Sequence, residues 1–124
     1  MPILSEDLAR TGHYLVSEAN GFRSRDKITI ASGAGVLKAG RVLGKITASG
    51  KYTSYTPGAT DGSQNAAAIL FEGCDATSAD VKRVATARDS EVQAAVLNWG
   101  AAVTTDAHKT TALAALAALG IISR

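Results

Sequence analysis

The sequence predicts a mainly β domain with a short C-terminal α-helix and an extended N-terminal arm. Several short segments alternate apolar and polar residues with a period of two, which is typical of half-buried strands. Glycine, proline, asparagine and aspartate cluster between these segments, as turns require. Near the C-terminus, leucines recur every three residues instead, which favours a helix with one apolar stripe.

The N-terminal arm is predicted because residues 1–19 follow neither hydrophobic period, apart from a short extended piece at residues 14–17. Asn20 and Gly21 then form a turn signal. We therefore expect one β-rich domain over residues 20–124.

The strands of the domain follow in order. Lys27 and Thr29 alternate with Ile28 and Ile30, which predicts a strand with one buried face. Further extended segments are predicted at residues 42–49, 51–56 and 66–73, and on both sides of a bend near residues 89–90. Turns are predicted at residues 31–35, 57–65 and 74–80.

Residues 38–51, KAGRVLGKITASGK, raise the question of a phosphate-binding loop. A Walker loop needs four residues between its glycines, a hydroxyl residue after the lysine, and a following helix. Here three or five residues separate the glycines, and Ile46 or Tyr52 follows the lysine. The period-two alternation predicts a β-ribbon instead, with glycines at its bends. An anion site at Lys45 and Lys51 is the alternative interpretation.

The helix is predicted at about residues 105–119. Thr104 or Thr105 can cap its first turn, and Asp106 suits the positive end of the helix dipole. Gly120 is well placed to terminate it. A buried stripe about 120° wide is predicted on this helix. It consists of Leu113, Leu116 and Leu119.

The core is expected to be poor in large side chains, because the chain has one tryptophan, three tyrosines and two phenylalanines. Small side chains bury little apolar area each, so a monomer should be marginally stable and association would help it. Trp99 is accordingly expected to anchor the core or a subunit contact.

Composition excludes several classes of protein. A net charge of +2, from 13 basic and 11 acidic residues, is too mild to indicate a nucleic-acid partner. Cys74 is the single cysteine, so no intrachain disulfide can form. The N-terminus does not resemble a signal peptide, and the most apolar window is too short to span a bilayer. We expect a soluble protein made in the cytoplasm, with no membrane partner.

No catalytic, cofactor or metal site is predicted. His13 and His108 are interpreted as surface polar residues, and Cys74 as a small buried thiol without an activating neighbour. Asp61 and Ser63 are expected to hydrogen-bond their own turn. We therefore expect a structural or binding protein and not an enzyme.

Four sequence markers occur in collinear order: SEANG followed by SRD, AG-x-VLGKIT-x-SGKY, DGSQ-x-AA-x-IL, and the terminal LAALGI--R. Together they resemble the head decoration proteins of tailed bacteriophages, the family of the lambda head protein D. The resemblance covers residues 15–124 and departs at Gly100, where relatives would be expected to carry a proline.

The resemblance implies a capsid cement protein with a β-clip-like bent ribbon or small barrel. Such a protein would bind the outer surface of the expanded head as a homotrimer at local threefold sites. It would contact the major capsid protein and stabilise the head against internal DNA pressure. The implied location is the virion. A structural domain of another phage assembly is an alternative.

Two sets of contact residues are expected in that setting. The arm, flexible until bound, would contact the capsid through Leu8, Tyr14, Leu15 and Val16. Subunits would meet through Trp99, Leu113, Leu116 and Leu119.

Overall fold

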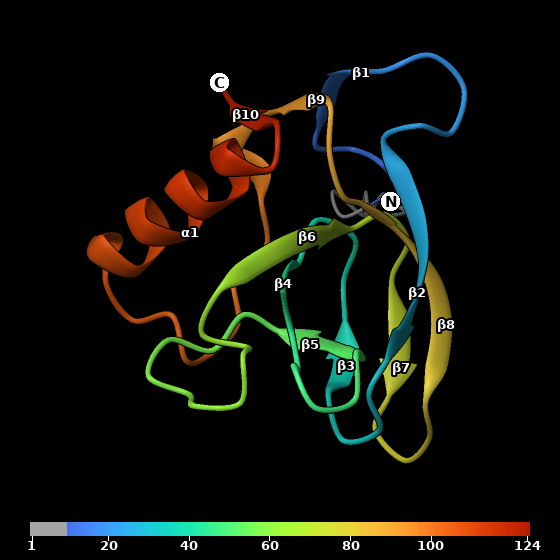
Figure 1. Ribbon diagram of the computed structural model, residues 1–124, viewed down its shortest axis with the longest axis vertical. Helices are drawn as coiled ribbons and strands as arrows, with labels where there is room; N and C mark the ends of the chain where they lie inside the picture. The colour runs from blue at the N-terminus through green and yellow to red at the C-terminus, as the bar shows by residue number, and fades with distance from the viewer. Residues whose placement is uncertain (1–9) are drawn as a thin grey trace, which may run out of the picture.

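The computed structural model describes residues 10–124 and contains ten strands, one 3₁₀ helix and one α-helix in that range (Figure 1). The strands are β1 Leu15–Glu18, β2 Arg25–Ile30, β3 Gly35–Leu37, β4 Val42–Lys45, β5 Tyr52–Ser54, β6 Ala66–Leu70, β7 Cys74–Ala76, β8 Val81–Thr86, β9 Ser90–Val92 and β10 Ile121–Ser123. The 3₁₀ helix η1 spans Ala94–Val96, and α1 spans Asp106–Ala118. The predicted class, mainly β with a C-terminal helix, is confirmed.

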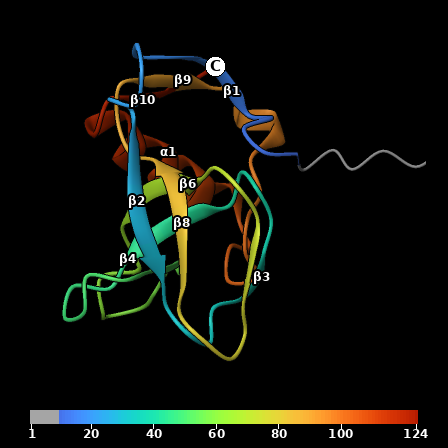
Figure 2. The ribbon, with the colours of Figure 1, turned by 90° about the vertical axis from the view of Figure 1, so that its right-hand side faces the viewer.

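Five strands close into a small barrel in the order β2-β5-β4-β6-β8. Its longest ladder joins β2 and β8, which run antiparallel from the Arg25–Thr86 pair to the Ile30–Val81 pair (Figure 2). The barrel interior is filled mainly by small and branched side chains, as a barrel of few strands requires. They are Ile28, Ile30, Leu37, Leu43, Ala68, Leu70, Cys74, Ala76 and Ala85.

A second core lies between the barrel, helix α1 and a three-stranded sheet of order β1-β9-β10 (Figure 1). Its buried members are Tyr14, Val42, Tyr55, Ala66, Ile69, Val92, Leu97, Ala112, Leu116 and Ile121. Val42 faces this core while the next residue, Leu43, faces the barrel interior. Because both faces of β4 and β6 are covered, their sequences are apolar runs rather than simple alternations.

The ribbon at residues 38–51 is shorter than predicted. Strand β4 ends at Lys45, whereas the alternation predicts extended backbone to residue 49. The chain turns there because Gly50 donates its backbone N–H to the Ile46 carbonyl, 2.8 Å away. The predicted turn at residues 74–80 is also partly wrong, since β7 lies within it and pairs with β3. A strand of three residues, such as β7, is too short to show the period of two in the sequence.

Helix α1 begins and ends where its signals predict. The Thr105 side chain accepts a hydrogen bond from the His108 N–H, and Gly120 follows the helix with a φ of 88°. The predicted leucine stripe is wrong at one end. Leu116 is 1% exposed, but Leu119 is 44% exposed, and the other fully buried helix residue is Ala112. The i, i+4 spacing of Ala112 and Leu116 tracks the buried face better than a spacing of three.

Residues 10–19 pack on the domain, although the sequence places them in the arm. The extended piece predicted near residues 14–17 corresponds to β1, which pairs antiparallel with β9. Tyr14 is 0% exposed, and its hydroxyl lies 2.7 Å from the Thr86 Oγ1. Burial is the main cause that raises the Tyr14 pKa above its ordinary value. The folded domain thus includes residues 10–19.

Candidate functional surfaces

The residues considered for catalysis are held by their own surroundings. The two ring nitrogens of His13 lie 2.8 and 3.1 Å from the carbonyl oxygens of Arg10 and Val96. His108 accepts a hydrogen bond at Nδ1 from the Thr104 N–H, 3.4 Å away. Cys74 is buried, and burial raises the pKa of its thiol. Within residues 10–124, no three His, Cys, Asp or Glu side chains gather closely enough to hold a metal ion.

The lysines of the glycine-rich ribbon lie close to other side chains of the domain. Lys51 Nζ lies 2.6 Å from Asp80 Oδ2, and Lys45 Nζ lies 5.9 Å from the centre of the Tyr52 ring. In the following loop, Asp61 accepts hydrogen bonds from the backbone N–H and hydroxyl of Ser63, as predicted. These bonds hold the pKa of Asp61 below its usual value. The ribbon is therefore tied into the barrel by its polar groups.

Trp99 sits where helix α1 meets the barrel. Its ring packs edge-to-face against Tyr55, with centroids 6.5 Å apart, and Lys109 Nζ lies 6.0 Å from its centre. Trp99 is half-buried and contacts the second core. Of the residues predicted for subunit contacts, Leu116 is used inside the domain, while Trp99, Leu113 and Leu119 keep exposed surface.

The predicted arm contacts fall into different environments. Leu8 lies outside the described residues. Tyr14 is part of the core and presents no surface, so its expected role as a contact is replaced by one in holding β1. Leu15 is half-buried, and Val16 is 56% exposed on an edge strand of the three-stranded sheet. The structure adds Phe22, 80% exposed, which the sequence did not single out.

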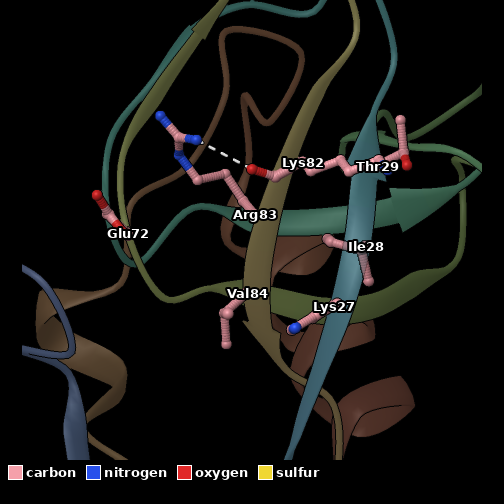
Figure 3. Close-up of a pocket in the computed structure, with 7 residues that line it drawn as sticks. All are labelled: Lys27, Ile28, Thr29, Glu72, Lys82, Arg83 and Val84. Carbon is pink, nitrogen blue, oxygen red and sulfur yellow. Dashed lines mark hydrogen bonds between the residues drawn. The ribbon is translucent and has the colours of Figure 1, made fainter.

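Two shallow grooves run across the outer face of β2 and β8. One is lined by Lys27, Ile28, Thr29, Glu72, Lys82, Arg83 and Val84 (Figure 3). The other is lined by Phe22, Arg25, Asp26, Lys27, Phe71, Glu72 and Val84. The grooves share Lys27, Glu72 and Val84, and the two linings together carry four basic and two acidic side chains. Arg83 is oriented by a hydrogen bond from its Nη1 to the Lys82 carbonyl, 2.9 Å away (Figure 3).

A polar junction attaches β1 to this face. Glu18 accepts hydrogen bonds from Ser24, at 2.6 Å, and from the Arg25 Nε, at 3.1 Å. The Arg25 guanidinium lies over the Phe71 ring, 4.1 Å from its centre. The Arg25 hydrogen bond is the main cause that lowers the pKa of Glu18. The junction therefore holds the start of the domain against the barrel.

Glu18→Gln is expected to remove the part of the pH dependence of the unfolding free energy that this junction causes. A carboxylate whose pKa is lowered by folding stabilises the protein above its unfolded pKa, about 4.3. That stabilisation disappears as the pH falls through the folded pKa. The wild type should therefore be more stable than the variant at pH 7, and the difference should shrink towards pH 3. Urea unfolding at several pH values measures this, and a pH-independent difference would contradict it.

Fold and surface together define a small structural domain that offers grooves and exposed apolar side chains to a partner. The model of the family "bacteriophage lambda head decoration protein D" matches residues 4–121, almost the whole chain. The chain belongs to this family, and its role is that of a phage head decoration protein, a structural component of the viral capsid. No curated protein matches the chain. In residues 10–124, no helix has the length and apolar character needed to cross a membrane.

Proposed function

We propose that the protein binds the outer surface of the expanded phage head as a homotrimer at local threefold sites. There it contacts the major capsid protein and stabilises the head against the internal pressure of packaged DNA. The family match over residues 4–121 is the observation that carries this proposal. The matched region includes most of the segment before residue 10 as well as the barrel and the helix. The proposed role therefore concerns the whole chain.

The N-terminal segment is the proposed capsid contact. Residues 1–9 include Leu8, and the edge strand β1 that follows exposes the side chain of Val16. Ordering a segment costs roughly 1–2 kcal/mol per residue, so one copy should bind weakly. Three copies on one trimer act together, and such avidity can exceed single-site affinity by about 10²–10⁴. Trimerisation is therefore what makes a short contact segment effective.

Deletion of residues 1–9 is expected to abolish binding to undecorated expanded heads and to leave the domain folded. The deletion spares Tyr14, which is fully buried, and Gly12, whose backbone N–H donates to the Phe71 carbonyl, 2.9 Å away. Cosedimentation with purified heads measures binding. Unfolding in urea provides the control for the domain.

Normal decoration by the truncated protein would contradict this assignment of the contact. A deletion of residues 1–14 is unsuitable, because it removes Tyr14 and would destabilise the second core. The mass in solution tests the oligomer separately. Light scattering should give about three times the 12.7 kDa of one chain.

A further inference from the structure

Arg41 is a half-buried cation at the start of β4 that is held in place by neutral groups. Its Nε donates to the Asn98 Oδ1 at 2.5 Å, and its Nη1 donates to the Ser54 Oγ at 3.2 Å. No carboxylate of residues 10–124 lies within ion-pair distance of this guanidinium. A guanidinium has five N–H donors, so three remain after these two bonds.

The surroundings of Arg41 are rigid. Asn98 is fixed by backbone hydrogen bonds on both sides, since its N–H donates to the Gly40 carbonyl and its carbonyl accepts from the Val42 N–H. Gly100 allows close packing here, because a Cβ at this position would lie 2.5 Å from Ser54 Oγ and 3.4 Å from Arg41 Nη1. The guanidinium is therefore oriented before any partner arrives, which reduces the entropy lost on binding.

Trp99, the next residue after Asn98, lies nearby, and Lys109 Nζ is 6.0 Å from the centre of its ring. Tryptophan and arginine are enriched at the energetically dominant centres of protein interfaces. A planar guanidinium with free donors matches the geometry of a carboxylate. A carboxylate would complete this site. Within residues 10–124, none lies close enough to pair with Arg41.

We propose that Arg41 binds a carboxylate of a second copy of this chain, and that the surface of Arg41, Trp99 and Lys109 is a subunit contact. This inference rests on the proposed homotrimer and names its contact. Glu72 and Asp106 are exposed carboxylates whose side chains form no ion pair or hydrogen bond within residues 10–124.

Asp106 is the favoured partner of the two. It lies one turn before Lys109 on α1, so it lies beside the Trp99 surface. In a rotationally symmetric trimer, each subunit presents one patch to a different patch of its neighbour. A threefold axis near α1 would bring the first turn of one helix against Arg41 of the next copy.

Arg41→Met is expected to raise the dissociation constant of the trimer by at least about tenfold, because it removes one partner of a buried charge pair. Arg41→Lys should weaken the trimer less, since it keeps the charge but loses the planar fork. Lys38→Met, at an exposed lysine nearby, is the matched control and should change nothing. Sedimentation equilibrium of the full chain measures the constants, and circular dichroism checks the fold.

A charge exchange keeps the test decisive if Arg41→Met is poorly folded. Arg41→Asp alone should dissociate the trimer, and adding Asp106→Arg or Glu72→Arg should restore it. A wild-type trimer that Arg41→Met leaves unchanged, or that neither exchange restores, would overturn this inference and leave the homotrimer standing. If the wild type is monomeric in solution, the same variants are compared on decorated heads, where independent occupancy in place of threefold clusters would overturn the homotrimer itself.

Discussion

Gly44→Ala is expected to destabilise the domain by about 3 kcal/mol, near the upper end for overpacked cores. A Cβ on Gly44 would lie 2.4 Å from the Ser63 carbonyl oxygen and 2.6 Å from its Cα. These are backbone atoms, which cannot rotate away as a side chain can. Ser63 is itself buried, and its carbonyl accepts the backbone N–H of Thr56 at 2.9 Å. The methyl group must therefore push the loop before β6 away from β4.

Gly50→Ala is the control that separates the steric clash at Gly44 from the cost of a left-handed backbone conformation. Gly50 has a φ of 73°, and a Cβ there would meet no atom within 4 Å. Its replacement should cost only about 1–2 kcal/mol, from the left-handed conformation alone. Urea unfolding at one protein concentration compares the two variants, since the stability of an oligomer depends on concentration. A Gly44→Ala loss no larger than that of Gly50→Ala would contradict the close approach of Ser63.

Leu116→Ala is expected to lower the free energy of unfolding by about 2–5 kcal/mol, the range for a leucine removed from a core. Leu116 is 1% exposed and packs in the second core, where helix α1 covers the barrel and the β1-β9-β10 sheet. The surrounding strands belong to closed or paired sheets, so they can collapse little into the cavity. Urea unfolding of the variant measures the loss.

Leu119→Ala is the matched control, because the same change on the same helix removes a side chain that is 44% exposed. It should cost less than about 1 kcal/mol in the stability of the domain. The pair also tests the interface predicted from sequence. If Leu116→Ala kept normal stability and instead lost the oligomer, Leu116 would be a subunit contact and not a core residue.

Local signals in the sequence were sufficient for several elements. The cap at Thr105, Asp106 in the first turn and Gly120 after the last turn located α1 within a residue or two. The alternation of Lys27 to Ile30 located β2, and the cluster of turn residues located the loop at residues 57–65. Such signals work because capping, alternation and turn formation depend on residues a few positions apart. The collinear markers also indicated the family, and the match over residues 4–121 confirms that family.

Tertiary structure decided the features that depend on residues far apart in the chain. Tyr14 lies in the segment that the sequence assigns to the arm, and it is buried because Thr86 and the second core pack against it. Strand β7 exists because β3 pairs with it, and β4 is buried on both faces because barrel and helix cover it.

For the candidate surfaces too, local sequence determined some features and tertiary structure the others. The sequence by itself determined the family, the decoration role and the main elements, because these reside in local patterns and in the order of motifs. Only the tertiary structure decided which half-buried side chains lie together, Arg41 with Asn98 and Ser54, and Glu18 with Arg25 and Phe71. The physical reason is that these groups meet through barrel closure and sheet pairing, which join segments whose separation no local pattern records.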